Sequence, residues 1–421
     1  MDTAIDSLKW KALNWANQFE VCAVLDSNDY QEKYSKYQYL IAADYTDILH
    51  TDYREAFEKL EKFRQSNPGW IFGGLGYDLK NDVEKLTSSN LDALSFPDCF
   101  FFVPKYLIGL SKNGLDVILG NPSIADEIIN ITPSLSPQEQ EEPPLIQQRF
   151  TREEYITKVK AIQQHIAAGD IYETNFCIDF YSENAIISPL ASFLKLNALS
   201  KAPFSSYFKW FDKFIICASP ERFLAKRGNQ LISQPIKGTA KRSKNTEEDL
   251  WLKNTLQQHP KERQENVMIV DLVRNDLTKS AIKGSVTVEE LFGVYSFQQV
   301  HQMISTVICK ANPTLSVIDI LKNTFPMGSM TGAPKIRAMQ LMEHYEKTKR
   351  GIYSGALGYI SPNNDFDFNV VIRSILYNAS QQYLSFHAGS AITYYADAEK
   401  EYEECLLKVK ALVQAVNGKL I

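Results

Sequence analysis

The 421-residue sequence lacks any long hydrophobic run. No stretch approaches the roughly 20 apolar residues that a helix needs to cross a bilayer, so no membrane association is expected. Residues 1–6 contain no basic segment followed by an apolar run, which argues against a secretory signal. The six cysteines are scattered without CxxC spacing, which disfavours both a zinc site and a disulfide framework. These absences favour a cytoplasmic protein with reduced thiols.

The sequence also lacks an excess of basic charge, because its formal net charge is −5. Such a chain is not expected to bind nucleic acid or an anionic membrane through its overall charge. The glycines of the segment 73–76 do not form a phosphate-binding pattern, and Asp78 follows where a basic residue would help. We interpret that segment as a tight turn. The apolar share of 44% and the charged share of 23% are typical of a globular protein.

The chain is long enough for two domains. Residues 1–120 alternate short aromatic runs with helical stretches, which predicts a small N-terminal lobe. Residues 121–150 contain five prolines and an acidic run at 139–142, and both features favour a linker. A capping-box pattern, Thr151-x-x-Glu154, then predicts the start of a helix. Residues 151–421 are therefore expected to form a larger catalytic domain.

One lysine is framed by residues that control the backbone. Lys237 follows Pro235 by two positions and immediately precedes Gly238, so a constrained residue and a permissive one flank it. This frame could hold an amine at a turn or strand end, as a lysine nucleophile requires. The alternative is a solvated surface lysine in a basic loop that includes Lys241 and Arg242.

Two pairs of glutamates lie far apart in the sequence. Glu262 and Glu265 are three residues apart and precede a very apolar run, so their charge must be offset in the fold. Glu401 and Glu404 have the same spacing on the final predicted helix. If the pairs met, their oxygen ligands would suit Mg²⁺. The alternatives are a buried network with arginines for the first pair and a solvated helix face for the second.

Other polar residues stand in apolar surroundings. Glu221 follows a probable strand and could be a buried acid or an ordinary capping group. Arg373 lies in a buried strand pattern and requires a carboxylate partner, which a substrate could supply. His301 and Tyr353, judged alone, are expected to be hydrogen-bonded core residues. The segment 389–391 offers backbone amides that are compatible with an anion.

Taken together, these segments resemble the chorismate-utilising enzymes, over about residues 150–416. The matching segments are, in order, 219–223, 235–239, 265–276, 284–286, 330–335, 350–355, 372–374 and 389–391, with Glu401 and Glu404. This resemblance implies an α+β fold of two packed, twisted β-sheets flanked by helices. It also implies that the active-site cleft lies between the sheets.

Within that family, Lys237 points to the aminodeoxychorismate synthase component I subgroup, because anthranilate synthase component I has alanine at this position. The resemblance implies that the Lys237 amine attacks the chorismate ring while the 4-hydroxyl leaves, with Glu221 as the general acid. Ammonia from a glutamine amidotransferase partner would then displace the lysine and give 4-amino-4-deoxychorismate, a precursor of 4-aminobenzoate and folate.

The resemblance also assigns a cofactor and a binding site. Glu265 and Glu404 would hold Mg²⁺ directly, and Glu262 and Glu401 would do so through water. Tyr353 and Arg373 would bind the enolpyruvyl carboxylate. The remaining candidates for the substrate pocket are Gly389, Ser390, Lys408, His301, Thr331 and Thr239.

Three segments depart from the family pattern. Glu173 stands where subgroup relatives commonly have glutamine and isochorismate-forming relatives have a lysine base. Tyr394 and Tyr395 replace smaller residues before the last helix, and the segment 24–27 only loosely resembles a tryptophan-binding segment. Two rival functions remain, namely anthranilate synthase component I and a non-catalytic chorismate-binding subunit. Lys237 argues against the first, and the joint presence of Lys237, Glu221 and both glutamate pairs argues against the second.

Overall fold

The computed structural model describes residues 4–132, 142–298 and 300–421. The helices are α1 (Ala4–Asn17), α2 (Ala56–Ser66), α3 (Lys80–Val83), α4 (Ile124–Asn130), α5 (Arg152–Ala167), α6 (Pro189–Ser200), α7 (Thr246–Gln258), α8 (Pro260–Thr278), α9 (Val317–Thr324), α10 (Lys335–Tyr345) and α11 (Ala398–Ala415), with the short 3₁₀ helices η1 (Tyr77–Leu79) and η2 (Gly328–Met330). Within these residues no helix is both long and apolar enough to span a bilayer.

The strands are β1 (Val21–Asp26), β2 (Tyr39–Thr51), β3 (Ile71–Leu75), β4 (Cys99–Ser111), β5 (Gly114–Leu119), β6 (Leu145–Gln148), β7 (Glu173–Ser182), β8 (Phe204–Trp210), β9 (Lys213–Ser219), β10 (Arg222–Arg227), β11 (Gln230–Gln234), β12 (Ile236–Lys241), β13 (Thr287–Ser296), β14 (Val300–Lys310), β15 (Gly332–Ala333), β16 (Ala356–Ile360), β17 (Phe366–Val370), β18 (Ser374–Asn378), β19 (Tyr383–Ile392) and β20 (Lys419–Leu420). Apart from the parallel pair β20–β6, the pairings are antiparallel.

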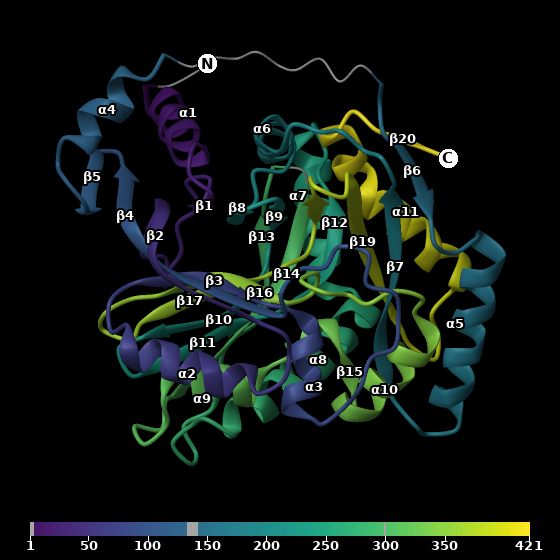
Figure 1. The fold of residues 1–421 in the computed structure, drawn as a ribbon. Helices are drawn as coiled ribbons and strands as arrows, with labels where there is room; N and C mark the ends of the chain where they lie inside the picture. Colours follow the sequence, from purple (N-terminus) through teal and green to yellow (C-terminus); the bar gives the residue numbers. More distant parts are fainter. Residues whose placement is uncertain (1–3, 133–141, 299) are drawn as a thin grey trace.

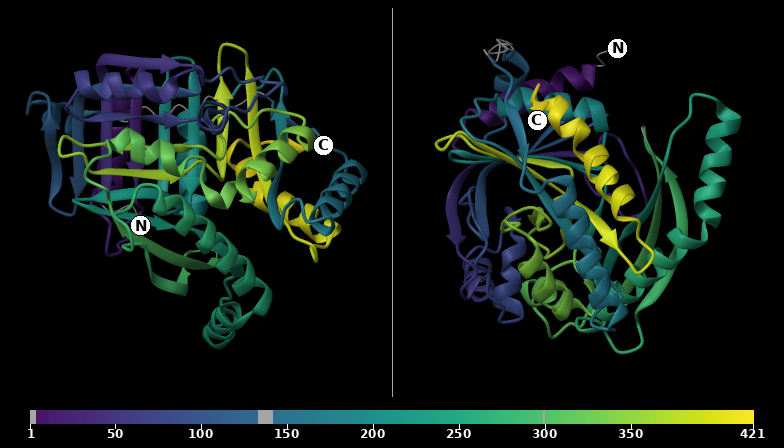
Figure 2. Two further views of the ribbon diagram at one scale, coloured as in Figure 1. Left: turned by 90° about the horizontal axis from the view of Figure 1, so that it is seen from below. Right: turned by 90° about the vertical axis from the view of Figure 1, so that its right-hand side faces the viewer.

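The strands form one continuous ladder with two halves that share the long antiparallel pair β2/β4. The first half runs β2–β1–β8–β9–β18–β19–β7, and the second runs β4–β3–β16–β17–β10–β11–β14. The halves face each other, since the Asn369 amide of β17 donates to the Phe204 carbonyl of β8. Figures 1 and 2 show the two layers from three sides.

Alternation along the strands separates two hydrophobic cores. On β1, Val21 and Ala23 belong to the core between the halves, whereas Cys22 and Val24 pack under the helices on the outer face. This follows from the two-residue period of a strand, which sends successive side chains to opposite faces. Helices α1, α5, α6 and α11 cover the outer face of the first half. Helices α2 and α9 lie below the second half, on the side away from the first (Figure 1), and their apolar residues belong to the same buried cluster as those of α8.

The interpretation of the segment 73–76 as a tight turn is wrong for its first three residues, which belong to β3. The glycines are there because neighbouring groups approach closely. A Cβ on Gly73 would lie 2.1 Å from the Phe100 carbonyl oxygen, and one on Gly74 would lie 2.5 Å from the Phe100 ring. A glycine inside a strand often marks such a close approach rather than a turn.

Strands from residues 1–120 pair with strands from residues 151–421, because β1 pairs with β8 and β3 with β16. Within the predicted linker, 121–150, the chain forms α4 and β6. Most of the acidic run at 139–142 lies outside the described residues. The division into lobe, linker and catalytic domain stays a prediction. The expected capping box is present, since the Thr151 hydroxyl accepts from the Glu154 amide and the Glu154 carboxylate accepts from the Thr151 amide.

Candidate active site

The candidate site lies where the chain crosses between the two halves of the ladder. Glu221 connects β9 of the first half to β10 of the second, and Arg373 connects β17 back to β18. Two backbone hydrogen bonds tie these crossings together, from the Ala218 amide to the Arg373 carbonyl and from the Val370 amide to the Glu221 carbonyl. The cleft predicted between the sheets therefore contains the residues at these crossings.

Lys237 lies on β12 at an irregularity in the strand. The register between β12 and β14 shifts between Ile236 and Thr239, and Gly238 has a φ of +103°. A bulge of this kind changes the direction in which a side chain points. The Lys237 carbonyl oxygen accepts a hydrogen bond from the Asn266 amide at 3.4 Å, so the strand is also held from α8.

Gly238 is required both by its backbone and by its neighbours, so we expect Gly238→Ala to lower stability and activity together. A Cβ would lie 3.1 Å from Glu262 Oε2 and 3.3 Å from Met303 Cβ. The positive φ should cost about 1–2 kcal/mol, and displacement of the neighbouring Lys237 should lower turnover about tenfold or more. Urea denaturation measures the loss of stability, and steady-state kinetics measure the loss of turnover.

Gly228→Ala is the matched control for this prediction. Gly228 has a φ of +59°, and no atom lies within 4 Å of the position that a Cβ would take there. The control should therefore lose stability through backbone strain and keep its turnover. Equal turnover in the Gly238 and Gly228 variants would contradict the importance of the bulge.

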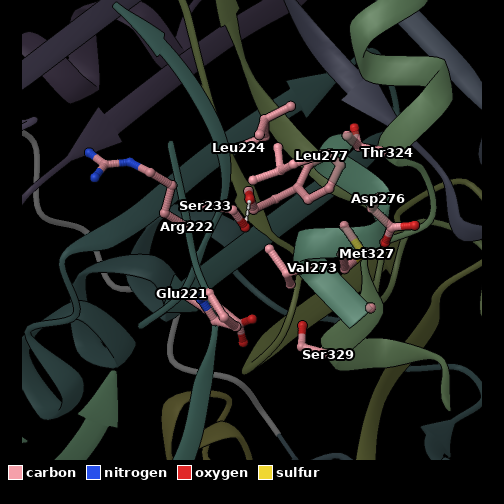
Figure 3. Close-up of a pocket in the computed structure, with 13 residues that line it drawn as sticks. Glu221, Arg222, Leu224, Ser233, Val273, Asp276, Leu277, Thr324, Met327 and Ser329 are labelled. Carbon is pink, nitrogen blue, oxygen red and sulfur yellow. Dashed lines mark hydrogen bonds between the residues drawn. The ribbon is translucent and has the colours of Figure 1, made fainter. Parts of the chain in front are cut away.

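Glu221 is a buried acid at the edge of the cleft, with 5% of its surface exposed. Burial raises the pKa of its carboxyl to about 7, although the Ser329 hydroxyl, Lys237 and the Ile236 amide each favour the charged form. Figure 3 shows Glu221 and Ser329 on one side of a pocket whose apolar wall includes Val273. A carboxyl with this pKa can donate a proton near neutrality.

The two glutamate pairs, far apart in the sequence, come together in the fold. Glu262 and Glu265 lie on α8, and Glu401 and Glu404 lie on α11. The Nζ atom of Lys261 lies 3.7 Å from Glu265 Oε1 and 3.8 Å from Glu401 Oε1, so one ammonium contacts both helices. In the chain as described, no three acidic, histidine or cysteine side chains are arranged to hold a metal ion.

The electrostatics of these carboxylates nevertheless suit a cation. Burial, followed by repulsion from Glu404, raises the pKa of Glu401 to about 7. Burial and the charge of Glu265 likewise raise the pKa of Glu262. Four carboxylates crowded together destabilise one another, and a hard divalent cation with oxygen ligands relieves this repulsion. The donor chemistry of the cluster therefore fits Mg²⁺.

The amine of Lys237 lies in the electrostatic field of these carboxylates and of one more. Burial acts to lower the pKa of Lys237, but Glu173, Glu265, Glu404 and Glu401 outweigh it and raise that pKa. Glu173 is only 2% exposed, and among the described residues its Oε2 has no hydrogen-bond partner. Lys237 is therefore a charged amine held among the carboxylates of the cleft.

The guanidinium of Arg373 has no ion-pair partner among the described residues. No carboxylate there lies within ion-pair distance of its guanidinium, and burial lowers its pKa against the effects of Tyr353 and Glu404. Tyr353 is itself buried, and its ring stacks on His387 with a centroid distance of 4.9 Å. A partly buried arginine without a carboxylate suits an anionic ligand.

Lys408 connects α11 to β19. Its Nζ lies 2.6 Å from Glu404 Oε1 and donates to the Gly389 carbonyl oxygen at 2.7 Å. A Cβ on Gly389 would lie 2.6 Å from the Asn175 side chain, so only glycine fits this position of the strand. Lys408 thus partly neutralises Glu404 and fixes α11 against the strand.

The side chains of Thr331 and His301 already have protein partners. The Thr331 hydroxyl donates to the carbonyl oxygens at the start of η2, at 3.1 and 3.3 Å. The two ring nitrogens of His301 lie 2.9 Å from Ser296 Oγ and 3.0 Å from Asp249 Oδ1. Both residues are buried. A role for either in binding substrate stays a prediction.

Ser390 and Thr239 also lie outside the group of converging side chains. The Ser390 hydroxyl is 2.6 Å from the Tyr155 hydroxyl of α5, which places it on the helix-covered face of β19. Only its backbone could serve the cleft. Thr239 follows the bulge of β12 and is exposed.

Sequence reasoning did not single out Lys261 or Arg350. Lys261 immediately precedes Glu262, a predicted metal ligand, but its contact with Glu401 forms only in the folded chain. Arg350 is 2% exposed and donates to the carbonyl oxygens of Met330 and Asn175, which fixes two segments beside the cleft. The sequence shows Arg350 only as part of a matching segment, without its burial.

Comparisons with known proteins show the family of this chain. Residues 19–414 match the family of chorismate binding enzymes. The chain is 33% identical to aminodeoxychorismate synthase component 1 of Bacillus subtilis (strain 168), over 83% of this chain and 77% of that protein. It is 34% identical to the probable chloroplastic aminodeoxychorismate synthase of Oryza sativa subsp. japonica, over 86% of this chain and 45% of that protein. The chain thus spans less than half of the rice relative.

A solved structure confirms the fold. Anthranilate synthase component I from Streptococcus pneumoniae TIGR4 superposes with a TM-score of 0.79, at 24% identity, over 91% of this chain and 93% of that one. The α+β architecture predicted from the motifs is therefore correct. Together with the match over residues 19–414, these findings show that the chain belongs to the chorismate binding enzyme family.

Proposed function

We propose that this protein is an aminodeoxychorismate synthase component I, which converts chorismate to 4-amino-4-deoxychorismate on the route to 4-aminobenzoate and folate. The observation that carries the proposal is the position of Lys237, on a strand bulge among Glu173, Glu265, Glu401 and Glu404. A single amine held in a cleft, near a buried acid, supports nucleophilic catalysis.

In the first step of the proposed reaction, the Lys237 ammonium gives one proton to a neighbouring carboxylate, from which it recovers that proton at the end of the cycle. The Nζ lone pair then forms a bond to the chorismate ring, and the bond to the 4-hydroxyl breaks. Glu221 gives its proton to that hydroxyl, which leaves as water. In the second step ammonia forms a bond to ring carbon 4, and the bond between the ring and Nζ breaks. The aminated product then returns one proton to Glu221, so both catalytic groups regain their starting forms.

The remaining residues bind and orient the substrate. In this proposal Glu265 and Glu404 would hold Mg²⁺ directly, and Glu262 and Glu401 would do so through water. The bound ion would supply positive charge for the ring carboxylate of chorismate. Ammonia would come from a glutamine amidotransferase partner.

Arg373 is expected to bind the enolpyruvyl carboxylate, so Arg373→Met should raise the KM for chorismate about tenfold or more. Arg373 has a φ of +53°, and any replacement keeps that backbone strain. Arg373→Lys is therefore the matched control, because it shares the strain but retains a charge. Steady-state kinetics at saturating ammonium should give an intermediate KM for the lysine variant, and an unchanged KM in Arg373→Met would contradict the assignment.

The proposed function is tested by analysing products with mass spectrometry. Purified protein is incubated with chorismate, Mg²⁺ and an ammonium salt at mildly alkaline pH. An aminated chorismate that retains its enolpyruvyl group supports the proposal. Anthranilate with pyruvate would identify an anthranilate synthase instead. Turnover that stays absent after addition of an amidotransferase would indicate a chorismate-binding subunit without catalysis.

A further inference from the structure

Lys261 contacts one glutamate of each pair on α8 and α11. It stands in the first turn of α8, immediately before Glu262. Its Nζ contacts Glu265 and Glu401 at 3.7 and 3.8 Å, and both carboxylates are more than nine-tenths buried. One flexible side chain therefore contacts two helices that lie far apart in the sequence.

All four glutamates act on this ammonium. Burial lowers the pKa of Lys261, but the charges of Glu265, Glu401, Glu262 and Glu404 together raise it. On the inner side of the cluster, Lys237 is influenced by three of the same carboxylates. On the outer side, 48% of the Lys261 side chain is exposed. Its ammonium can therefore leave the cluster for water by rotation of its own side chain.

We propose that Lys261 is a tethered counter-ion, which holds the two glutamate pairs together without metal and is displaced when a divalent cation binds. This inference rests on the metal site of the proposed function. It accounts for two observations at once, the convergence of the carboxylates and the lack of a closed metal-binding group among the described residues. The ammonium contacts Glu265 and Glu401, of which the first would hold the ion directly and the second through water in the proposed function.

Displacement of Lys261 should weaken the binding of Mg²⁺ to the wild-type protein. A partly exposed ion pair contributes a fraction of a kcal/mol to about 1 kcal/mol. Breaking the contacts with Glu265 and Glu401 is thus expected to cost about threefold to tenfold in affinity. Lys261→Gln keeps most of the side-chain length and removes the charge, so it should bind Mg²⁺ more tightly by that factor. Lys261→Arg retains the charge and should resemble the wild type.

The test is the thermal unfolding of the full chain without chorismate, in a series of Mg²⁺ concentrations at constant ionic strength. A ligand that binds only the folded state stabilises it by RT ln(1 + [L]/Kd), so the dependence of Tm on Mg²⁺ concentration gives an apparent Kd. In EDTA, Lys261→Gln should unfold at a lower temperature than the wild type, because four carboxylates lose their counter-ion. With saturating Mg²⁺ this deficit should disappear. Lys112→Gln removes a charge from the exposed turn between β4 and β5 and is the matched control.

Tighter binding of Mg²⁺ by Lys261→Gln, with unchanged binding by the Lys261→Arg and Lys112→Gln variants, supports the proposal. Equal or weaker binding by Lys261→Gln overturns it, and so does the absence of any effect of Mg²⁺ on Tm in the wild type. These outcomes do not depend on turnover. Failure to aminate chorismate would refute the proposed function without altering this measurement.

Discussion

Replacing Lys237 with alanine is expected to abolish the amination of chorismate, with turnover reduced about a thousandfold or more. The reason is chemical, because the variant has no amine to form the bond to the ring in the first step. The loss should appear in kcat, since Arg373 and the glutamate pairs that are proposed to bind substrate are unchanged. Mass spectrometry of the products and steady-state kinetics measure the effect.

Lys241→Ala is the matched control, because Lys241 is an exposed lysine on the same strand as Lys237. No ion pair involves it within the described residues, so its loss should leave turnover within about twofold of the wild type. A Lys237→Ala variant that still forms the 4-amino product at a rate near that of the wild type would exclude the covalent mechanism. It would leave the family assignment intact.

The sequence predicts much of the site because its elements are short and local. A Pro-Ile-Lys-Gly segment specifies a constrained strand, and the structure places a bulge and a positive φ there, at Lys237 and Gly238. The three-residue spacing of each glutamate pair places both members on one face of a helix. Both features depend only on residues that lie within four positions of one another in the sequence, so the sequence shows them directly.

Contacts between distant segments are what the sequence does not specify. The approach of Lys261 to Glu401 joins residues 140 positions apart. The raised pKa of Glu221 likewise depends on burial between strands. The glycines at 73 and 74 have the composition of a turn, but their closeness to Phe100 in the neighbouring strand explains them. In each case the residue's environment is formed by segments that are distant in the sequence and come together only when the chain folds.

Glu173 illustrates the same limit within the site. Its difference from the family pattern is visible in the sequence, but its environment is not. In the structure it is buried at the start of β7, and its pKa is raised by burial and lowered in turn by Lys237. A carboxylate in this position contributes to the field that keeps Lys237 positive. The substitution therefore affects the nucleophile as well as the walls of the cleft.

Glu221→Gln is expected to lower kcat about 100-fold to 10,000-fold, which is the usual contribution of a general acid. Glutamine preserves the size of the side chain but cannot give a proton to the departing hydroxyl. Glu183→Gln is the matched control, because Glu183 is exposed and has no ion pair within the described residues. Steady-state kinetics should show a large loss of kcat only in the first variant, with little change in the KM for chorismate.

The raised pKa of Glu221 predicts how stability and kcat change with pH. The pKa of Glu221 is raised from 4.5 to about 7, so the folded protein holds a proton on this group that the unfolded chain has already released. Stability should therefore fall as pH rises from 4.5 to about 7, and Glu221→Gln should lack that part of the decline. In the wild type, kcat at saturating free ammonia should decrease above about pH 7 as the acid loses its proton. A wild-type kcat that keeps rising through this range would assign the proton donor to another group, since a deprotonated Glu221 cannot protonate the leaving hydroxyl.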